Sequence, residues 1–124
     1  MLNFFDKLWT IKKALEERGH EVLLPSMKDF SNRGEDSFAK VQYDLIRSHF
    51  NKIDQSDAIY VANFEKNGVS GYIGGNSFLE MGKAFDKGLK IFLLNQIPQA
   101  SYRDELIALK PIVIGENWDL IKKN

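Results

Sequence analysis

The chain has no cysteine among its 124 residues. This absence excludes disulfide bonds, thiol nucleophiles and thiolate metal sites, and it fits a reducing compartment such as the cytoplasm. The chain also lacks an excess of charge of either sign, because 17 basic residues balance 17 acidic ones. A protein without net positive charge is not drawn to polyanions. We therefore expect neither a nucleic acid polymer nor a membrane as a partner.

Long hydrophobic runs, signal-peptide patterns, internal repeats and linkers are absent as well. No apolar run approaches the roughly 20 residues that a membrane span requires. With 44% hydrophobic and 12% aromatic residues, the composition is that of a folded chain rather than a disordered one. A chain of this length can bury one core. We expect a single cytoplasmic domain over residues 1–124.

The spacing of apolar residues predicts alternating helices and strands. Helices are expected over about 3–18, 36–54, 77–85 and 98–109, with a closing turn at 118–121. Strands are expected over 20–24, 56–63, 89–94 and 111–114. This order predicts an α/β fold, a flavodoxin-like or Rossmann-like doubly wound parallel sheet of about four or five strands flanked by helices.

The amino end departs from that pattern. Doubly wound domains generally open with a strand, whereas this chain enters a helix directly after Met1-Leu2-Asn3. The departure predicts that a strand ahead of residue 1 is missing. The sheet would then lack a strand that is normally central.

Residues 56–94 carry the clearest functional signal. They read as a strand, a glycine-rich loop over 68–76, a helix containing Glu80, and a second strand. Ligands of open parallel sheets collect at the carboxyl ends of the strands, where this loop and Glu80 are expected. Glycines in such a loop let a sugar or phosphate approach the backbone closely. The candidate binding residues are Gly71, Tyr72, Gly74, Gly75, Asn76 and Ser77.

The run from Gly71 to Ala84, with 56–61 before it and 87–91 after it, resembles the signature of the nucleoside 2-deoxyribosyltransferase family. The resemblance also covers 18–25, so it spans roughly Leu8 to Leu94. That family includes the related deoxynucleotide N-glycosidases. The resemblance implies that Glu80 is the nucleophile that attacks the anomeric carbon and forms a glycosyl-enzyme intermediate. It also implies a small nucleoside or nucleotide as substrate, no cofactor, and a homodimer or larger homo-oligomer. Asn76-Ser77 replaces the usual Gly-Thr of the family.

Glu80 and His49 each allow a second interpretation. Ser77-Phe78-Leu79-Glu80 fits a capping box, in which Ser77 and Glu80 only satisfy free amides of a first helical turn. Glu80 in such a turn would also be kept ionised by the helix dipole. His49 follows Leu45 by four residues on an apolar stripe, which is typical of a core histidine. As a catalytic residue, it would be the general acid that protonates the departing base.

These observations predict cleavage or exchange of an N-glycosidic bond, with Glu80 and His49 as the catalytic residues. One alternative is a nucleotide sensor on the same fold that lacks catalysis. Another is a structural subunit whose loop makes an oligomer contact. No group of histidine and acidic residues has the spacing of metal ligands, so we expect no metal.

Overall fold

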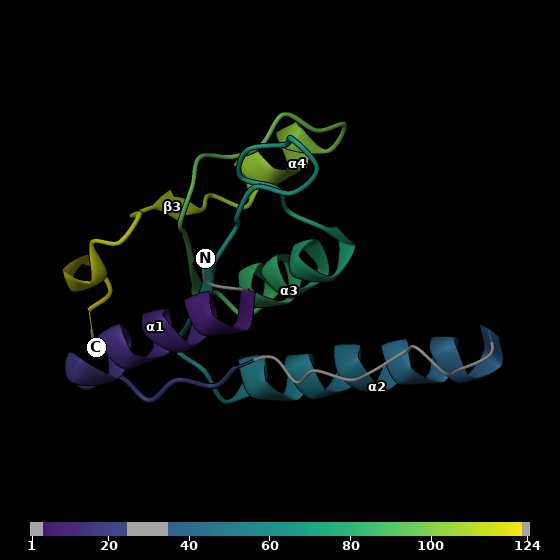
Figure 1. Ribbon diagram of the computed structural model, residues 1–124, viewed down its shortest axis with the longest axis horizontal. Coiled ribbons are helices and arrows are strands. Elements are labelled where there is room, and N and C mark those ends of the chain that lie inside the picture. The colour runs from purple at the N-terminus through teal and green to yellow at the C-terminus, as the bar shows by residue number, and fades with distance from the viewer. Residues whose placement is uncertain (1–3, 25–34, 123–124) are drawn as a thin grey trace.

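The computed structural model describes residues 4–24 and 35–122, and it has an α/β architecture (Figure 1). A three-stranded parallel sheet is flanked by helices. The elements are α1 (Phe4–Glu17), α2 (Glu35–Asp54), β1 (Ala58–Val61), α3 (Gly75–Asp86), β2 (Lys90–Leu93), α4 (Arg103–Ala108), β3 (Ile112–Val113) and a 3₁₀ turn, Trp118–Leu120.

The strands lie side by side in the order β1-β2-β3, which is also their order along the chain. Val61 pairs with Leu93, and Leu93 pairs with Val113. α3 links β1 to β2 and α4 links β2 to β3, as parallel strands require. The expected parallel α/β fold is confirmed, but the described residues form three strands where four or five were expected.

The hydrophobic core lies between the sheet and α3. The central strand β2 is the most deeply buried, with Ile91, Phe92 and Leu93 at most 4% exposed. Met81 and Ala84 of α3 are fully buried against it. Burying one such large apolar side chain stabilises a fold by about 1.5–3 kcal/mol. α3 is therefore fixed firmly on the sheet, and its outer face can present polar groups in a defined position.

The helices agree with the sequence pattern, with changes at their ends. α1 and α2 match the expected ranges to within a residue, except that Asn3 lies outside the described residues. α3 begins at Gly75, two residues earlier than expected, and α4 begins only at Arg103. None of the described helices has the length and apolar character needed to cross a membrane.

The strand expected at 20–24 is wrong, because these residues form no strand. A strand needs a neighbour that accepts and donates its backbone hydrogen bonds. The nearest strand, β1, is separated from 20–24 by a cavity that both segments line. The apolar run Val22-Leu23-Leu24 has the composition of a strand, but it has no strand beside it within the described chain.

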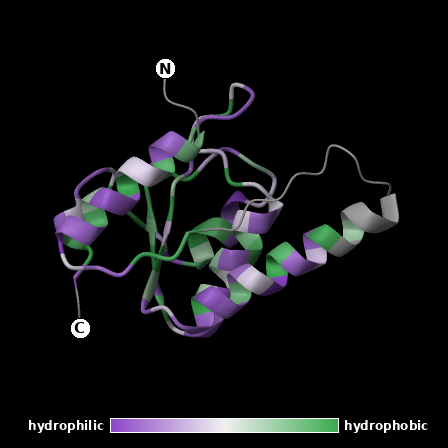
Figure 2. Cartoon of the chain, turned by 60° about the horizontal axis from the view of Figure 1, so that its bottom comes forward, coloured by the Kyte–Doolittle hydropathy of each residue, from purple (hydrophilic) through white to green (hydrophobic). Residues whose placement is uncertain are grey.

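α1 lies on the opposite side of the strands from α2 and α3 (Figure 2). Its apolar side chains recur at helical spacing between polar ones, yet Leu15 is the one buried residue of α1. Phe4, Phe5 and Trp9 remain 45–52% exposed. An amphipathic helix ordinarily buries its apolar stripe. The apolar stripe of α1 is therefore only partly covered.

Candidate functional site

Glu80 and His49 meet across the contact between α3 and α2. The Nδ1 atom of His49 lies 2.5 Å from Oε1 of Glu80, and both side chains are largely buried, at 13% and 25% exposure respectively. Hydrogen bonds to an ionised carboxylate are among the stronger ones in proteins. The two residues that the sequence singled out for catalysis, 31 positions apart, are thus in direct contact.

The position of Glu80 on its helix differs from the sequence-based expectation. Gly74 is the N-cap of α3, and the first turn contains no acidic residue. Glu80 therefore lies in the second turn, where the amides already have partners within the helix. The capping-box interpretation is wrong, and the expected help from the helix dipole is weak at this depth. The partner of Glu80 is His49 instead.

The Glu80–His49 contact is one of several polar contacts along the α2–α3 seam. At one end, Asn76 Nδ2 donates to Gln42 Oε1 at 3.2 Å. At the other, the Asp54 carboxylate binds Lys83 at 3.1 Å and also accepts from Lys87, the C-cap residue that follows α3. Such contacts hold two helices in register. Glu80 can therefore have a purely structural role in this seam. Whether the Glu80–His49 pair can also bind a ligand depends on the groups around it.

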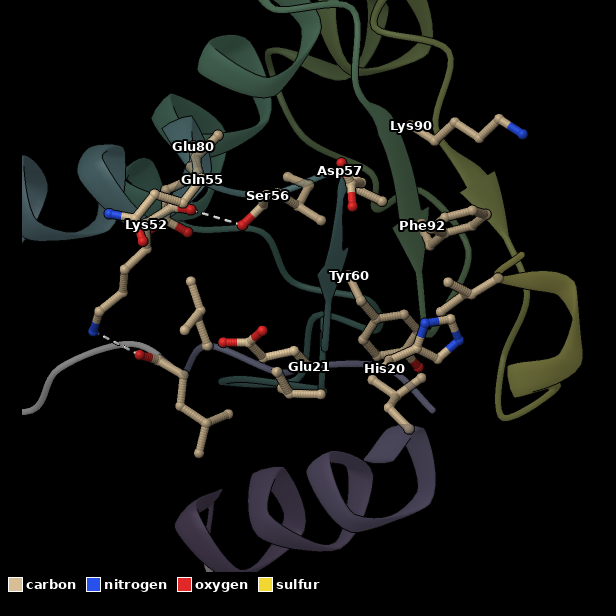
Figure 3. A pocket seen from close by; sticks show the side chains of 18 of the residues that line it. His20, Glu21, Lys52, Gln55, Ser56, Asp57, Tyr60, Glu80, Lys90 and Phe92 are labelled. Carbon is tan, nitrogen blue, oxygen red and sulfur yellow. Dashed lines mark hydrogen bonds between the residues drawn. The ribbon is translucent and has the colours of Figure 1, made fainter. Parts of the chain in front are cut away.

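The pair borders a cavity of about 840 Å³ between β1 and the 20–24 segment. Figure 3 shows Glu80, Asp57 and Tyr60 on one side, and His20 and Glu21 on the other, above α1. The walls also carry apolar side chains: Leu15, Val22, Leu24, Ile53, Ile59 and Phe92. A cavity of this size with a few convergent polar groups has the dimensions of a small-molecule site.

One hydrogen bond joins the two sides of the cavity. Lys52 Nζ, from α2, donates to the carbonyl oxygen of Leu24 at 2.8 Å (Figure 3). Ser56, at the end of α2, donates to the Lys52 carbonyl at 2.7 Å. The Lys52–Leu24 bond thus joins α2 to the 20–24 segment at this end of the cavity, and the Ser56 bond closes the last turn of α2.

The glycine-rich loop lies elsewhere. Gly71 is buried, has a positive φ of 69°, and a Cβ there would lie 2.3 Å from the carbonyl oxygen of Gln96. The ring of Tyr72 packs on Gly74, while Gly75 faces open space. Gly71 and Gly74 therefore have roles in packing the loop. Within the described chain, none of the six predicted binding residues from Gly71 to Ser77 lines the cavity that contains Glu80 and His49.

Asn63 holds this loop in place, a role that the sequence did not reveal. It is the one buried polar residue of the described chain, at 2% exposure. Its Nδ2 donates to the carbonyls of Gly71 and Asn95 at 3.2 and 3.0 Å, and its Oδ1 accepts from the Asn95 amide at 2.8 Å. Asn95 Nδ2 donates back to the Asn63 carbonyl at 2.9 Å. The available signal was an asparagine two residues past the end of each of two parallel strands.

Two titratable groups near the site have shifted pKa values. The hydrogen bond from Lys83 is the main reason why the pKa of Asp54 lies below its usual value. Burial, assisted by the charge of Glu116, raises the pKa of Tyr60 well above its usual value. Tyr60 also donates its hydroxyl to the Gly115 carbonyl at 2.8 Å. Tyr60 is therefore a neutral wall of the cavity at any ordinary pH.

Histidine and acidic side chains do not gather into a metal site in the part of the chain that the structure describes. Searches with this chain against protein-family models, curated proteins and solved structures found no match. The resemblance noted above therefore rests on the sequence ranges 18–25, 56–61, 71–84 and 87–91 alone.

Proposed function

We propose that this protein cleaves or transfers the N-glycosidic bond of a deoxynucleoside or deoxynucleotide, with Glu80 as the nucleophile. One observation carries the proposal: the Glu80 carboxylate is oriented by His49 at 2.5 Å in the wall of a cavity large enough for such a ligand. A carboxylate that is buried, oriented and open to a cavity is what a glycosidase nucleophile requires.

In the proposed reaction, a carboxylate oxygen of Glu80 bonds to the anomeric carbon while the bond from that carbon to the base nitrogen breaks. The base leaves with the electron pair of that bond and takes up a proton from solvent water. Water, or the nitrogen of a second base, then attacks the same carbon, loses a proton to solvent, and releases Glu80 with the electron pair of the glycosyl-enzyme bond. The net reaction needs no cofactor.

The geometry favours a positioning role for His49 over the general-acid role that the sequence suggested. In retaining glycosidases the acid lies about 5–5.5 Å from the nucleophile, which leaves room for the scissile bond between them. The Nδ1 atom of His49 instead touches Glu80 directly. We propose that it holds one carboxylate oxygen and so aims the other at the substrate.

A nucleotide sensor without catalysis is the second candidate, and a specific observation favours it. The glycine-rich loop that should hold the sugar lies outside the cavity of Glu80, within the described residues. Ligand affinity without base release would identify the sensor.

For the fold, we propose that the three parallel strands belong to a doubly wound, flavodoxin-like sheet.

The test is to incubate the protein with a panel of deoxynucleosides and their monophosphates and to measure free base by chromatography. Glu80→Gln keeps the shape of the side chain but removes the attacking charge, so base release should fall by orders of magnitude while ligand affinity is kept. Asp54→Asn is the matched control, because it also converts a carboxylate of the same seam to an amide but does not line the cavity.

His49→Asn and His49→Ala separate the two roles of the histidine. Asparagine places an amide near the position of Nδ1, so it should retain activity that alanine loses if His49 only positions Glu80. Equal losses in both variants, together with loss of one limb of the pH profile, would assign proton transfer to His49. Base release from Glu80→Gln at the wild-type rate would exclude the proposed nucleophile.

A further inference from the structure

A two-residue turn lies at the start of the glycine-rich loop. The Val69 amide donates to the Lys66 carbonyl at 2.9 Å, and the Lys66 amide donates back to the Val69 carbonyl at 3.2 Å. The two residues between them, Asn67 and Gly68, have positive φ values of 52° and 80°. Positive φ at both central residues is typical of a type I′ turn, for which Asn-Gly is a preferred sequence.

The same dipeptide is chemically reactive. Asn67 is the one asparagine of the chain that is followed by glycine. The backbone nitrogen of the next residue can attack the side-chain carbonyl carbon of an asparagine, because these atoms close a small, unstrained ring. A Cβ atom on that next residue crowds the approach, and glycine has none. Asparagine is a labile residue in general, and it is most labile before glycine.

The surroundings of Asn67 and Gly68 leave room for this attack. Both residues are exposed to solvent, and a Cβ placed on Gly68 would meet no atom within 4 Å. Within the described residues, neither the Asn67 side chain nor the Gly68 amide makes a hydrogen bond. The attacking nitrogen and the carbon that it attacks therefore lie in an exposed turn, where local motion is least restricted.

Asn76 provides a comparison within the same loop region. It is also exposed, and the residue after it is a small serine. Its side chain donates to Gln42 Oε1 at 3.2 Å, and its backbone belongs to α3. A helical backbone is fixed and does not rotate freely to close the ring. The structure thus separates an unrestrained asparagine from a restrained one.

We propose that Asn67 is a site of spontaneous modification, at which the Gly68 nitrogen closes on the Asn67 side chain and converts it, through a cyclic imide, to aspartate and isoaspartate. The co-reactant is water. The reaction goes beyond the chemistry proposed for Glu80 and is independent of it.

The first step forms the ring. The Gly68 nitrogen gives its proton to solvent and bonds to Cγ of Asn67. The bond from Cγ to Nδ2 breaks, and Nδ2 leaves with its electron pair, takes a proton from solvent and departs as ammonia. This step forms one C–N bond and breaks another, and it needs no oxidant or reductant.

The second step opens the ring. Water adds to one of the two ring carbonyl carbons, and the bond from that carbon to the Gly68 nitrogen breaks, after which the nitrogen takes up a proton. Addition at Cγ gives aspartate. Addition at the main-chain carbonyl carbon gives isoaspartate, in which the chain runs through Cγ. In sum, one water is consumed and one ammonia is released, and the new carboxyl group is ionised at neutral pH.

The two products disturb the turn differently. Aspartate keeps the backbone and adds a charge, whereas isoaspartate also adds one atom to the main chain between Lys66 and Val69. A turn with two central residues cannot accept that atom and keep both Lys66–Val69 bonds. Further along, Asn63 still holds the Gly71 carbonyl at 3.2 Å. The disturbance should therefore stay within residues 66–70.

The test is to age the purified full chain at mildly alkaline pH and to digest it with trypsin. Trypsin cleaves after Lys66 and Lys83, and no lysine or arginine lies between them, so one peptide, 67–83, carries both Asn67 and Asn76. Fragmentation in the mass spectrometer locates the change, and chromatography separates aspartate from isoaspartate. Asn67 should convert at least about tenfold faster than Asn76, which corresponds to a barrier lower by about 1.4 kcal/mol.

Asn67→Gln is the matched control. Glutamine keeps an amide in the same turn, but its ring would need one more atom, so position 67 should stay unmodified. Conversion of this glutamine at the asparagine rate would overturn the proposal, as would equal rates at Asn67 and Asn76. Aspartate without isoaspartate would indicate direct hydrolysis instead of a cyclic imide. Conversion in urea but not in the native protein would show that the folded turn prevents the attack, contrary to the proposal.

The purified isoaspartate form supplies a second measurement. Asn67→Asp is its control, because this variant has the same charge without the extra backbone atom. In the isoaspartate form the Val69 amide should exchange about tenfold faster than in Asn67→Asp, while the Asn95 amide, held by Asn63, should be unchanged. Equal Val69 exchange in the two proteins would refute the predicted loss of the turn. None of these readouts uses turnover, so failure here and failure of the Glu80 mechanism are distinguishable.

Discussion

Replacing Asn63 with alanine is the sharpest test of how the glycine-rich loop is held. The substitution removes the 2.8 Å bond from the Asn95 amide and the donations to the Asn95 and Gly71 carbonyls at 3.0 and 3.2 Å. Each such bond contributes about 1 kcal/mol net, and a buried amide left without a partner costs about 1–3 kcal/mol. We expect a loss of about 2–4 kcal/mol for Asn63→Ala.

The loss can be measured by urea unfolding and by thermal melting. For a chain of this size, about 1 kcal/mol corresponds to roughly 4 °C, so the melting temperature should fall by about 8–16 °C. Asn51→Ala is the control, because Asn51 is an exposed asparagine of α2 and its loss should change stability by less than about 0.5 kcal/mol. A cost below about 1 kcal/mol for Asn63→Ala would refute the reasoning.

Asn63→Asp gives the same argument an independent check. Aspartate keeps the acceptor for the Asn95 amide but turns an oxygen toward two carbonyl oxygens. Burial and these carbonyls should raise its folded pKa above the unfolded value of about 3.9. Stability should therefore be highest below that unfolded value, where the acid is protonated, and should fall as the pH rises through the folded value. A stability that rises over this range would contradict the described geometry.

Three further predictions concern packing, charge and assembly. Gly71→Ala should destabilise more than Gly88→Ala, since both have positive φ but only Gly71 would place a Cβ 2.3 Å from a carbonyl oxygen; equal urea midpoints would contradict this. Lys83 lowers the folded pKa of Asp54. The ionised Asp54 side chain therefore stabilises the folded state above the unfolded pKa of about 3.9, and this contribution is lost as the pH falls through the folded pKa. Asp54→Asn should therefore flatten the acid limb of stability between pH 2 and 5, and an unchanged limb would count against the ion pair. The exposed Trp9 of α1 is expected to lie in a homodimer interface, so light scattering should give a dimer mass that Trp9→Ser reduces; a monomeric wild type would exclude this.

The sequence predicted the positions of helices and strands better than the pairing of strands in the sheet. The long helix α2 was found nearly to the residue, because 20 residues repeat one apolar period. The strand expected at 20–24 failed because pairing depends on a distant neighbour, which the run Val22-Leu23-Leu24 does not encode. The start of α3 was placed late because Gly74 and Gly75 read as loop, although glycine is acceptable at an N-cap.

For the candidate site, the residue types were predictable but their geometry was not. Glu80 and His49 were singled out separately, and only the parallel packing of α2 on α3 brings their side chains to 2.5 Å. The same packing places Asn76 on Gln42 and leaves the glycine-rich loop outside the cavity. Helix-to-helix register is a tertiary property, so no spacing within either segment could supply it.

The order of the strands has a consequence for how the chain folds. Because β1, β2 and β3 are neighbours in the sheet in the same order as in the chain, no pairing from Ala58 to Val113 skips a strand. Ala58 pairs with Lys90, 32 residues along the chain, and Phe92 with Ile112, 20 residues along, so each pairing still has to close a loop that contains a whole helix. The folding nucleus should therefore form around β1, α3 and β2, with Met81 closing on Leu93 early. α1 should dock late, so substitutions in it should speed unfolding and leave the folding rate almost unchanged.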